Sequence, residues 1–198
     1  MIVPSAPTHS RKTQIDHTAT ALFRARGYAA TSMRELAAAL GLEAGSLYSH
    51  IKSKEEILDR VCFGLAADFF TGFDAATAES AAPVAAQLRH AIEAHVRVLI
   101  RDSAASAVFL HEWRHLSEPA RTEFLALRDR YEAGFRTLIA HGLAAGELHT
   151  PDAAFAALTL LASLNWLPNW YRPDGKLNPD EIAHRLAEQL LNGIRSGQ

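Results

Sequence analysis

Hydrophobic residues recur three and four positions apart along most of this chain, the spacing that places them on one face of an α-helix. No segment shows the alternation of apolar and polar residues that is typical of a half-buried strand. The pattern therefore predicts an all-α protein, in which glycine, proline and capping residues separate the helices. The predicted helices cover residues 11–26, 32–41, 43–51, 53–76, 84–101, 104–116, 118–145, 152–166 and 179–195.

Two of these predicted helices, 32–41 and 43–51, are too short to be stable alone, because isolated helices of fewer than about 12 residues are marginal in water. The sequence LGLEAG joins them, and its Gly41 suits the end of a helix. Two short helices with so tight a junction are typical of a helix-turn-helix, whose second helix enters the major groove of DNA. The helices before and after would supply the packing that stabilises this pair.

The second short helix, EAGSLYSHI, divides into an inner and an outer face. Leu47 and Ile51 are four residues apart, so both are predicted to face the core. Tyr48 and His50 are predicted to face outward, where hydroxyl and imidazole groups can bond phosphates or bases. A purely structural role for Tyr48 or His50 stays open as the alternative.

Charge is divided unevenly along the chain. The formal net charge is −2, but residues 1–54 hold seven Lys or Arg against three Asp or Glu, a net of +4, which leaves −6 for the rest. A basic end on an acidic protein is expected where one module meets phosphate and another does not. Lys54 adds to this end beside the exposed N–H groups of a helix start. An ordinary solvated surface would also account for these counts.

Length and composition favour a cytoplasmic protein with no membrane partner. The chain has 198 residues, of which 48% are hydrophobic, and can bury a substantial core. No apolar run reaches the roughly 18 to 20 residues of a membrane span, and the start MIVPSAPTHSRK lacks the apolar segment of a signal peptide. The single cysteine, Cys62, excludes an intramolecular disulfide and a cysteine-rich zinc module.

The run FRARGYAATSMRELAAALGLEAGSLYSHIKSKEEIL resembles the N-terminal DNA-binding domain of the TetR family of bacterial transcriptional regulators. It departs from the family at Ile51, where Phe is usual, and at Leu40, where Ala is usual. The matching residues are Phe23, Gly27, Tyr28, Thr31, Ala37, Gly41, Gly45, Leu47, Tyr48, His50, Lys54, Glu55 and Leu58. By this resemblance the DNA contacts are Thr31, Gly45, Ser46, Tyr48, His50 and Lys54.

The resemblance also implies two domains and a homodimer. A DNA-binding domain would span residues 10–56, with its helix-turn-helix at about 32–51, and a ligand-binding and dimerisation domain would span 57–198. Family members usually dimerise through their last two helices, and a dimer can span a palindromic operator. The segment DAAFAALTLLASLNW permits this, since it is apolar on nearly every face. The segment EIAHRLAEQLLNGI has a narrower apolar stripe, formed by Ile182, Leu186, Leu190 and Ile194. The alternative is that both helices only complete the core of a monomer.

The second half, from HEWRHLSEPARTEFLALRDRYEAGFRTLI to LNWLPNWYRPDGKLNPDEIA, resembles family members that respond to acyl-CoA thioesters. Such an effector needs apolar walls for its acyl group and cationic groups for its phosphates. The resemblance implies a repressor that a small hydrophobic or acyl-CoA effector releases from DNA, without cofactor, metal or catalytic residue. The aromatic residues could instead be core, and the arginines ordinary surface. The predicted ligand-binding residues are Arg97, Phe109, Trp113, Leu116, Arg128, Tyr131, Asn165, Trp166 and Trp170.

The sequence HEWRH supports a competing hypothesis. It matches the H-E-x-x-H pattern of zinc proteases, with His111 and His115 on one helical face and Glu112 as a general base. The pattern is short, and no established third-ligand signature follows it. A third hypothesis is a helical interaction protein that does not bind DNA. Zinc content would identify the hydrolase, and a lack of salt-sensitive DNA affinity would identify the interaction protein.

Overall fold

A computed structural model describes residues 10–79 and 81–193 of the chain, and the regular elements in these ranges are all helical. The all-α prediction is therefore confirmed. The elements are α1 (Arg11–Arg26), α2 (Met33–Ala39), α3 (Ala44–Tyr48), α4 (Lys54–Thr77), α5 (Val84–Arg101), α6 (Ser103–His111), the 3-10 turn η1 (Trp113–His115), α7 (Glu118–Ala144), α8 (Ala153–Asn165), α9 (Leu167–Trp170) and α10 (Pro179–Asn192).

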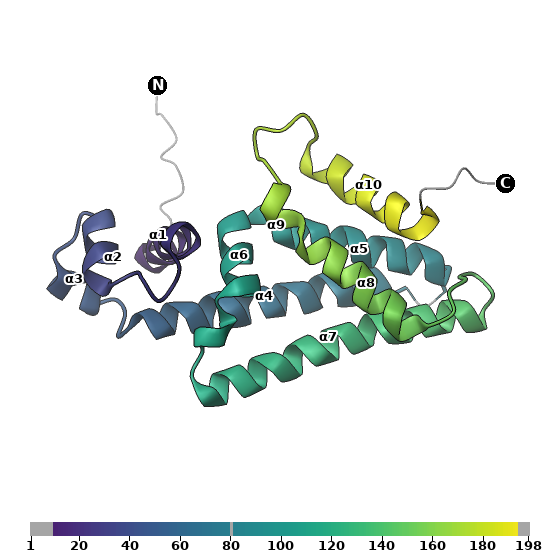
Figure 1. Cartoon of the computed structure of the whole chain (residues 1–198), viewed down its shortest axis with the longest axis horizontal. Coiled ribbons are helices and arrows are strands. Elements are labelled where there is room, and N and C mark those ends of the chain that lie inside the picture. Colours follow the sequence, from purple (N-terminus) through teal and green to yellow (C-terminus); the bar gives the residue numbers. More distant parts are fainter. Residues whose placement is uncertain (1–9, 80, 194–198) are drawn as a thin grey trace, which may run out of the picture.

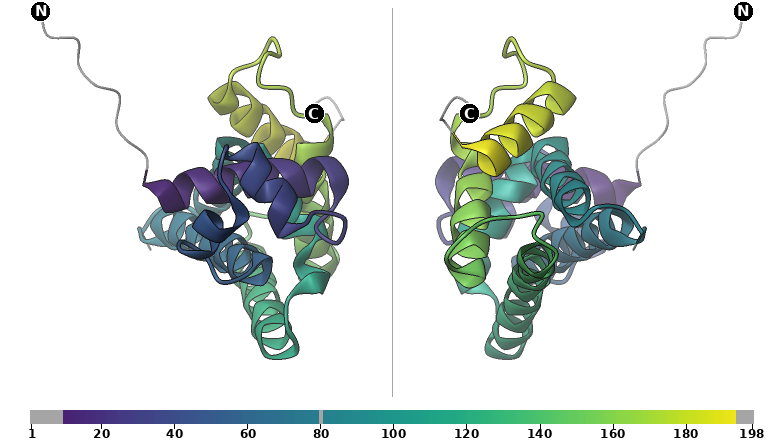
Figure 2. Two further views of the ribbon diagram at one scale, coloured as in Figure 1. Left: turned by 90° about the vertical axis from the view of Figure 1, so that its left-hand side faces the viewer. Right: turned by 90° about the vertical axis from the view of Figure 1, so that its right-hand side faces the viewer.

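The helices form a small cluster and a larger bundle that α4 connects. α1, α2 and α3 lie at one end of the molecule, and α4 runs from them into the bundle (Figure 1). There α5 packs along α4, α10 along α5, and α8 along α7. Viewed from the end, α10 and α7 lie on opposite sides of the bundle (Figure 2). The arrangement places the short helices where another molecule can reach them.

Local sequence explains why the short helix α2 forms. Ser32 accepts a hydrogen bond from the Glu35 N–H, and the Glu35 side chain accepts one from the Ser32 N–H, which completes a capping box. Tertiary packing adds to this, because Leu36 of α2, Leu47 of α3 and Ile15 of α1 are all buried in one core.

Several predicted helix boundaries differ from the structure. The predicted helices 32–41 and 43–51 are shorter, since α2 covers Met33–Ala39 and α3 covers Ala44–Tyr48. The predicted helix 104–116 is divided, since α6 ends at His111 and η1 follows it. The predicted helix 179–195 ends at Asn192, and residues 194 and 195 lie outside the described residues. α8 ends at Asn165, and the short α9, which has Pro168 in its first turn, follows it.

Candidate DNA-binding surface and ligand cavity

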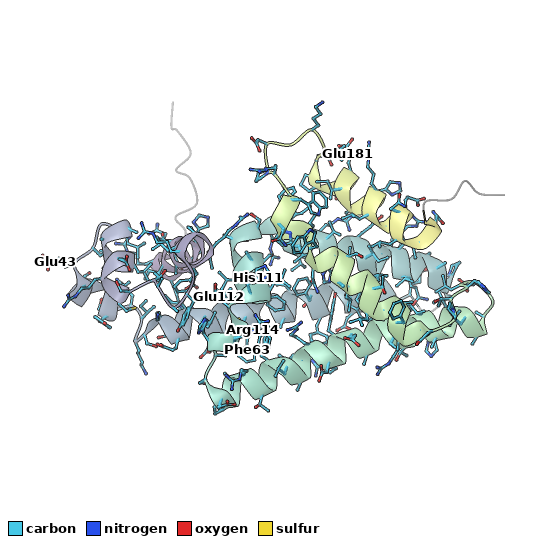
Figure 3. All side chains as sticks on the ribbon, in the orientation of Figure 1. Glu43, Phe63, His111, Glu112, Arg114 and Glu181 are labelled. Atoms are coloured by element: carbon cyan, nitrogen blue, oxygen red, sulfur yellow. The ribbon has the colours of Figure 1, made fainter. Side chains whose placement is uncertain are left out.

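The exposed face of α3 carries three of the residues predicted to contact DNA, and a fourth, His50, follows the helix. Gly45, Ser46 and His50 are exposed, and Tyr48 is 54% exposed. Leu47 and Ile51 are 0% and 2% exposed, so their predicted core positions are confirmed. Glu43, which precedes α3, lies at the tip of the molecule (Figure 3). The helix thus presents small and hydroxyl-bearing residues outward.

Thr31 and Lys54 line a surface hollow of about 380 Å³ together with Tyr48. Lys54 Nζ donates hydrogen bonds to the carbonyl oxygens of Tyr28 at 3.0 Å and Thr31 at 3.1 Å, and lies 4.3 Å from the centroid of the Tyr28 ring. The Thr31 hydroxyl donates to the Gly27 carbonyl oxygen, and the residue is 2% exposed. Both side chains therefore hold the α1–α2 loop in place, and their contact with DNA stays a prediction.

A cavity of about 370 Å³ lies within the larger bundle. Four predicted ligand-binding residues line it: Phe109, Arg128, Tyr131 and Asn165. Its other walls come from residues that sequence reasoning did not select, namely Ala66, Phe69, Phe70, His95, Leu110, Leu125, Leu127, Asp129, Glu132, Leu158, Leu161 and Ala162. Most of these look like ordinary core in the sequence. One of them could have been recognised in the sequence, because His95 is a polar residue within the largely apolar stretch AHVRVLI.

The other five predicted ligand-binding residues do not line this cavity. Trp166 and Trp170 point outward and are 63% and 46% exposed, whereas Asn165, the residue before Trp166, lines the cavity from α8. Leu116 is buried in the core. Arg97 is exposed and forms ion pairs with Glu93 and Asp180. Trp113 packs against Phe124, with ring centroids 6.2 Å apart.

Three polar side chains from three helices meet at the cavity. His95 Nδ1 lies 3.1 Å from the Tyr131 hydroxyl, and His95 Nε2 lies 3.2 Å from Asn165 Oδ1. Burial lowers the pKa of His95 to about 4, although the hydrogen bond that His95 donates to Asn165 Oδ1 acts in the other direction. Burial likewise raises the pKa of Tyr131. The set His95, Tyr131 and Asn165, called the polar trio below, is therefore uncharged near neutral pH.

Comparison with known families agrees with this architecture. A family model described as bacterial regulatory proteins of the tetR family matches residues 15–61. A second model, described as a tetracyclin repressor-like C-terminal domain, matches residues 81–194, which is more than half of the chain. The chain belongs to the TetR family. The predicted resemblance of its N-terminal region to TetR regulators is therefore confirmed.

Individual relatives of this TetR-family chain are transcriptional regulators. The HTH-type transcriptional repressor KstR2 of Rhodococcus jostii is 28% identical over 188 residues, covering 94% of this chain and 92% of the relative. The solved structure of the TetR-family regulator PfmR from Thermus thermophilus is 35% identical with a TM-score of 0.81, and the match covers 92% of this chain and 100% of that one. AibR, solved in complex with isovaleryl coenzyme A and operator DNA, is 26% identical with a TM-score of 0.78, over 91% and 98% of the two chains.

Two arginines of this TetR-family regulator flank one indole beside the cavity. The guanidinium carbons of Arg114 and Arg128 lie 4.9 and 5.3 Å from the centroid of the Trp113 ring. Within the described parts of the chain, neither arginine forms an ion pair with a carboxylate. Arg128 lines the cavity and Arg114 lies beside it, while the same lining also contains the carboxylates of Asp129 and Glu132.

The HEWRH segment does not form the site that the hydrolase hypothesis requires. Because α6 ends at His111, His115 lies in η1 and the two histidines do not share a face of one α-helix. His115 instead stacks on Tyr28 of the N-terminal cluster, with ring centroids 5.1 Å apart, and its Nε2 lies 3.5 Å from Glu112 Oε2. His111 and Glu112 lie near the middle of the molecule (Figure 3). The family assignment and its relatives give the zinc hydrolase no support.

In the part of the chain that the structure describes, no helix is both long enough and apolar enough to cross a lipid bilayer.

Proposed function

We propose that this TetR-family regulator is a repressor, that it binds a palindromic operator as a homodimer, and that an acyl-CoA thioester releases it. The observation that carries the effector assignment is the apolar cavity with unpaired arginines beside it. The similar AibR, solved with isovaleryl coenzyme A and operator DNA, adds support from a related chain. The relatives named above are regulators, so we expect no catalytic activity.

DNA binding is assigned to residues 10–56. The exposed residues Gly45, Ser46 and Tyr48 of α3, and His50 just after it, would meet the major groove and its phosphates. Thr31 and Lys54 would lie beside a phosphate, and Lys54 would contribute its charge while it holds the α1–α2 loop. A regulator of this kind owes much of its affinity to phosphate contacts, so binding should weaken steeply with salt.

The effector's two halves match the two parts of the cavity. Its acyl group would enter among Phe69, Phe109 and Leu161, where apolar surface is buried on binding. Its phosphates would meet Arg114 and Arg128, whose planar guanidinium groups suit phosphate geometry. The cavity volume of about 370 Å³ lies within the range of small-molecule sites.

Two elements connect the cavity to the DNA-binding end. α4 starts at Lys54 in the DNA-facing hollow and contributes Ala66, Phe69 and Phe70 to the cavity, about 18 Å further along its axis. The segment formed by α6 and η1 contributes Phe109 to the cavity and His115 to the stack on Tyr28. An effector that prefers a different position of these elements shifts the regulator away from DNA by its differential affinity for the two states.

The dimer is assigned to the outer face of α8, with α10 beside it. Phe155, Leu158 and Trp166 are 67%, 53% and 63% exposed, and this is far more apolar surface than a solvated helix needs. The apolar face of α10 is directed inward, since Ile182, Ala183 and Ala187 are buried. A second copy that packs on α8 would remove the exposed aromatic residues from water.

A thermal-shift screen of the full chain tests the effector class, using free acids and their CoA thioesters as matched pairs. A ligand that binds only the folded state raises the melting temperature, by an amount that grows with its concentration. We expect thioesters to raise it and the free acids to leave it unchanged. A gel shift with operator DNA then measures release by the active thioester. A response to the acids, or to neither group, would contradict the acyl-CoA assignment and leave the family assignment intact.

A further inference from the structure

The cavity holds polar groups that an apolar acyl chain would not use. His95, Tyr131 and Asn165 come from α5, α7 and α8, and all three line the same space as Phe69, Phe109 and Leu161. Polar side chains in an apolar interior cost free energy unless they are fully hydrogen-bonded, and apolar residues of similar shape avoid that cost. Packing of the bundle therefore does not explain why these three positions are polar.

The hydrogen bonds within the trio leave donors unused. Asn165 supplies two N–H groups, and neutral His95 and Tyr131 supply one donor each. Because Asn165 Oδ1 faces His95 Nε2, the His95 N–H donates to Asn165 and the Tyr131 hydroxyl donates to His95 Nδ1, so both N–H groups of Asn165 stay unused. Among the described residues, neither Asn165 nor Tyr131 forms another hydrogen bond, and neither side chain is sealed from solvent without a partner. The remaining donors are therefore available to a molecule in the cavity.

The trio lies at the closed side of the cavity. His95 is 3% exposed and stacks on Phe69, itself 4% exposed, with ring centroids 4.6 Å apart. Leu125, which also lines the cavity and lies three residues before Arg128, is 38% exposed and marks its mouth. An acyl group that enters with its CoA part outside would thus bring its far end, rather than its thioester, to the trio.

We propose that the effector's acyl group carries an oxygen acceptor, a ketone or a hydroxyl, that accepts a hydrogen bond from the Asn165 amide, which His95 and Tyr131 hold in place. This inference rests on the proposed acyl-CoA function of the same cavity. A site built to donate to an oxygen rejects the analogue that lacks it, because its buried donors are then left without partners. The polar trio accordingly selects oxygenated acyl groups over hydrocarbon chains of equal length.

Calorimetric titration of the full chain with matched thioesters tests the selection. The pairs are hexanoyl-CoA with 5-oxohexanoyl-CoA and octanoyl-CoA with 7-oxooctanoyl-CoA. We expect the oxo member of at least one pair to bind about tenfold more tightly, which is equivalent to about 1.4 kcal/mol. Equal affinities within both pairs would overturn the inference while the effector class stands. Failure of all four thioesters to bind would overturn the effector class, and the inference with it.

Variants of the polar trio then test whether these side chains cause the preference for oxo thioesters. Asn165→Leu replaces the amide by an apolar side chain of similar size, and Tyr131→Phe removes only a hydroxyl, which guards against a folding defect in the first variant. Each should reduce the oxo preference to below about threefold and leave hydrocarbon thioesters bound as before. Asn192→Leu at the end of α10 is the matched control and should keep the full preference. Equal weakening of both members of a pair would show that the thioester carbonyl is the acceptor and would overturn the proposal.

Discussion

Neighbouring residues of α3 and the start of α4 have opposite roles, and exposure separates them. Leu47 is 0% exposed and belongs to the core, whereas the adjacent Tyr48 is 54% exposed. Lys54 combines both roles, because its ammonium group holds two backbone carbonyls and also lies in the hollow that Tyr48 lines. A substitution at Lys54 should therefore affect both DNA affinity and stability, and one at Tyr48 only DNA affinity.

Lys54→Ala should weaken operator binding about tenfold and reduce the salt dependence of binding by about one ion per half-site, since one phosphate contact is lost. It should also lower the melting temperature, because the carbonyl oxygens of Tyr28 and Thr31 lose a charged donor. Tyr48→Phe should weaken binding without changing the melting temperature. Gel shifts over a range of salt concentrations and thermal unfolding measure both effects. Lys176→Ala, far along the chain from this end, is the control, and an unchanged salt slope in Lys54→Ala would refute the contact.

His95 makes the stability of the fold dependent on pH. Its pKa is about 4 in the folded chain against about 6.5 when exposed, so the unfolded chain binds a proton over this interval and the folded chain does not. Its contribution is complete above about pH 6.5 and is lost as the pH falls toward about 4, by up to about 3 kcal/mol. Urea unfolding at several pH values measures this slope. His95→Phe should flatten the slope over that interval, and the exposed His149→Gln should not; equal slopes in all three proteins would refute the role of His95.

At the scale of elements, the 3-10 turn η1 in the HEWRH segment contacts both the N-terminal cluster and the larger bundle. The 3-10 turn places His115 on Tyr28 of the N-terminal cluster, while Trp113, two residues earlier, packs on Phe124 of the bundle. A short turn that contacts both parts of the molecule can transmit a shift between them, if the two parts have discrete relative positions.

His115→Ala should uncouple the effector from DNA. We expect effector affinity to stay within about twofold, because His115 does not line the cavity, and we expect the effector to reduce operator affinity several-fold less than in the unaltered chain. Operator affinity with and without a saturating thioester measures the coupling. The exposed His141→Ala on α7 serves as the control. If the effector reduces operator affinity as strongly in His115→Ala as in the unaltered chain, the effect of the effector is transmitted through α4 and not through η1.

At the scale of the whole molecule, the exposed apolar face of α8 predicts a dimer that forms through this helix. Phe155→Arg should shift the protein from dimer to monomer, because a charge cannot be buried there without a partner. Operator affinity should fall by more than tenfold, since a monomer meets a single half-site. Sedimentation measures the assembly, and Ala126→Arg at an exposed position of α7 is the control. A dimer that survives in Phe155→Arg would move the interface away from this part of α8.

The sequence by itself determined the helices and the DNA-binding motif, because both depend on local signals. Helical spacing, caps such as Ser32 and breakers such as Gly41 act within a few residues, and the matching residues from Phe23 to Leu58 occur in one continuous run. The core positions of Leu47 and Ile51 also follow from their four-residue spacing, although α3 itself ends at Tyr48.

Only the tertiary structure decided which residues share the cavity, because that depends on how distant helices are rotated against one another. In the sequence, Phe69 of α4 and His95 of α5 have apolar neighbours like those of any core residue, yet both line the cavity. Trp166 and Trp170, which were predicted to line it, face outward. The division of the predicted helix 104–116 is likewise tertiary, since His115 leaves the α-helix to stack on Tyr28, 87 positions earlier in the chain. Helix periodicity specifies a face, and packing between helices decides what that face meets.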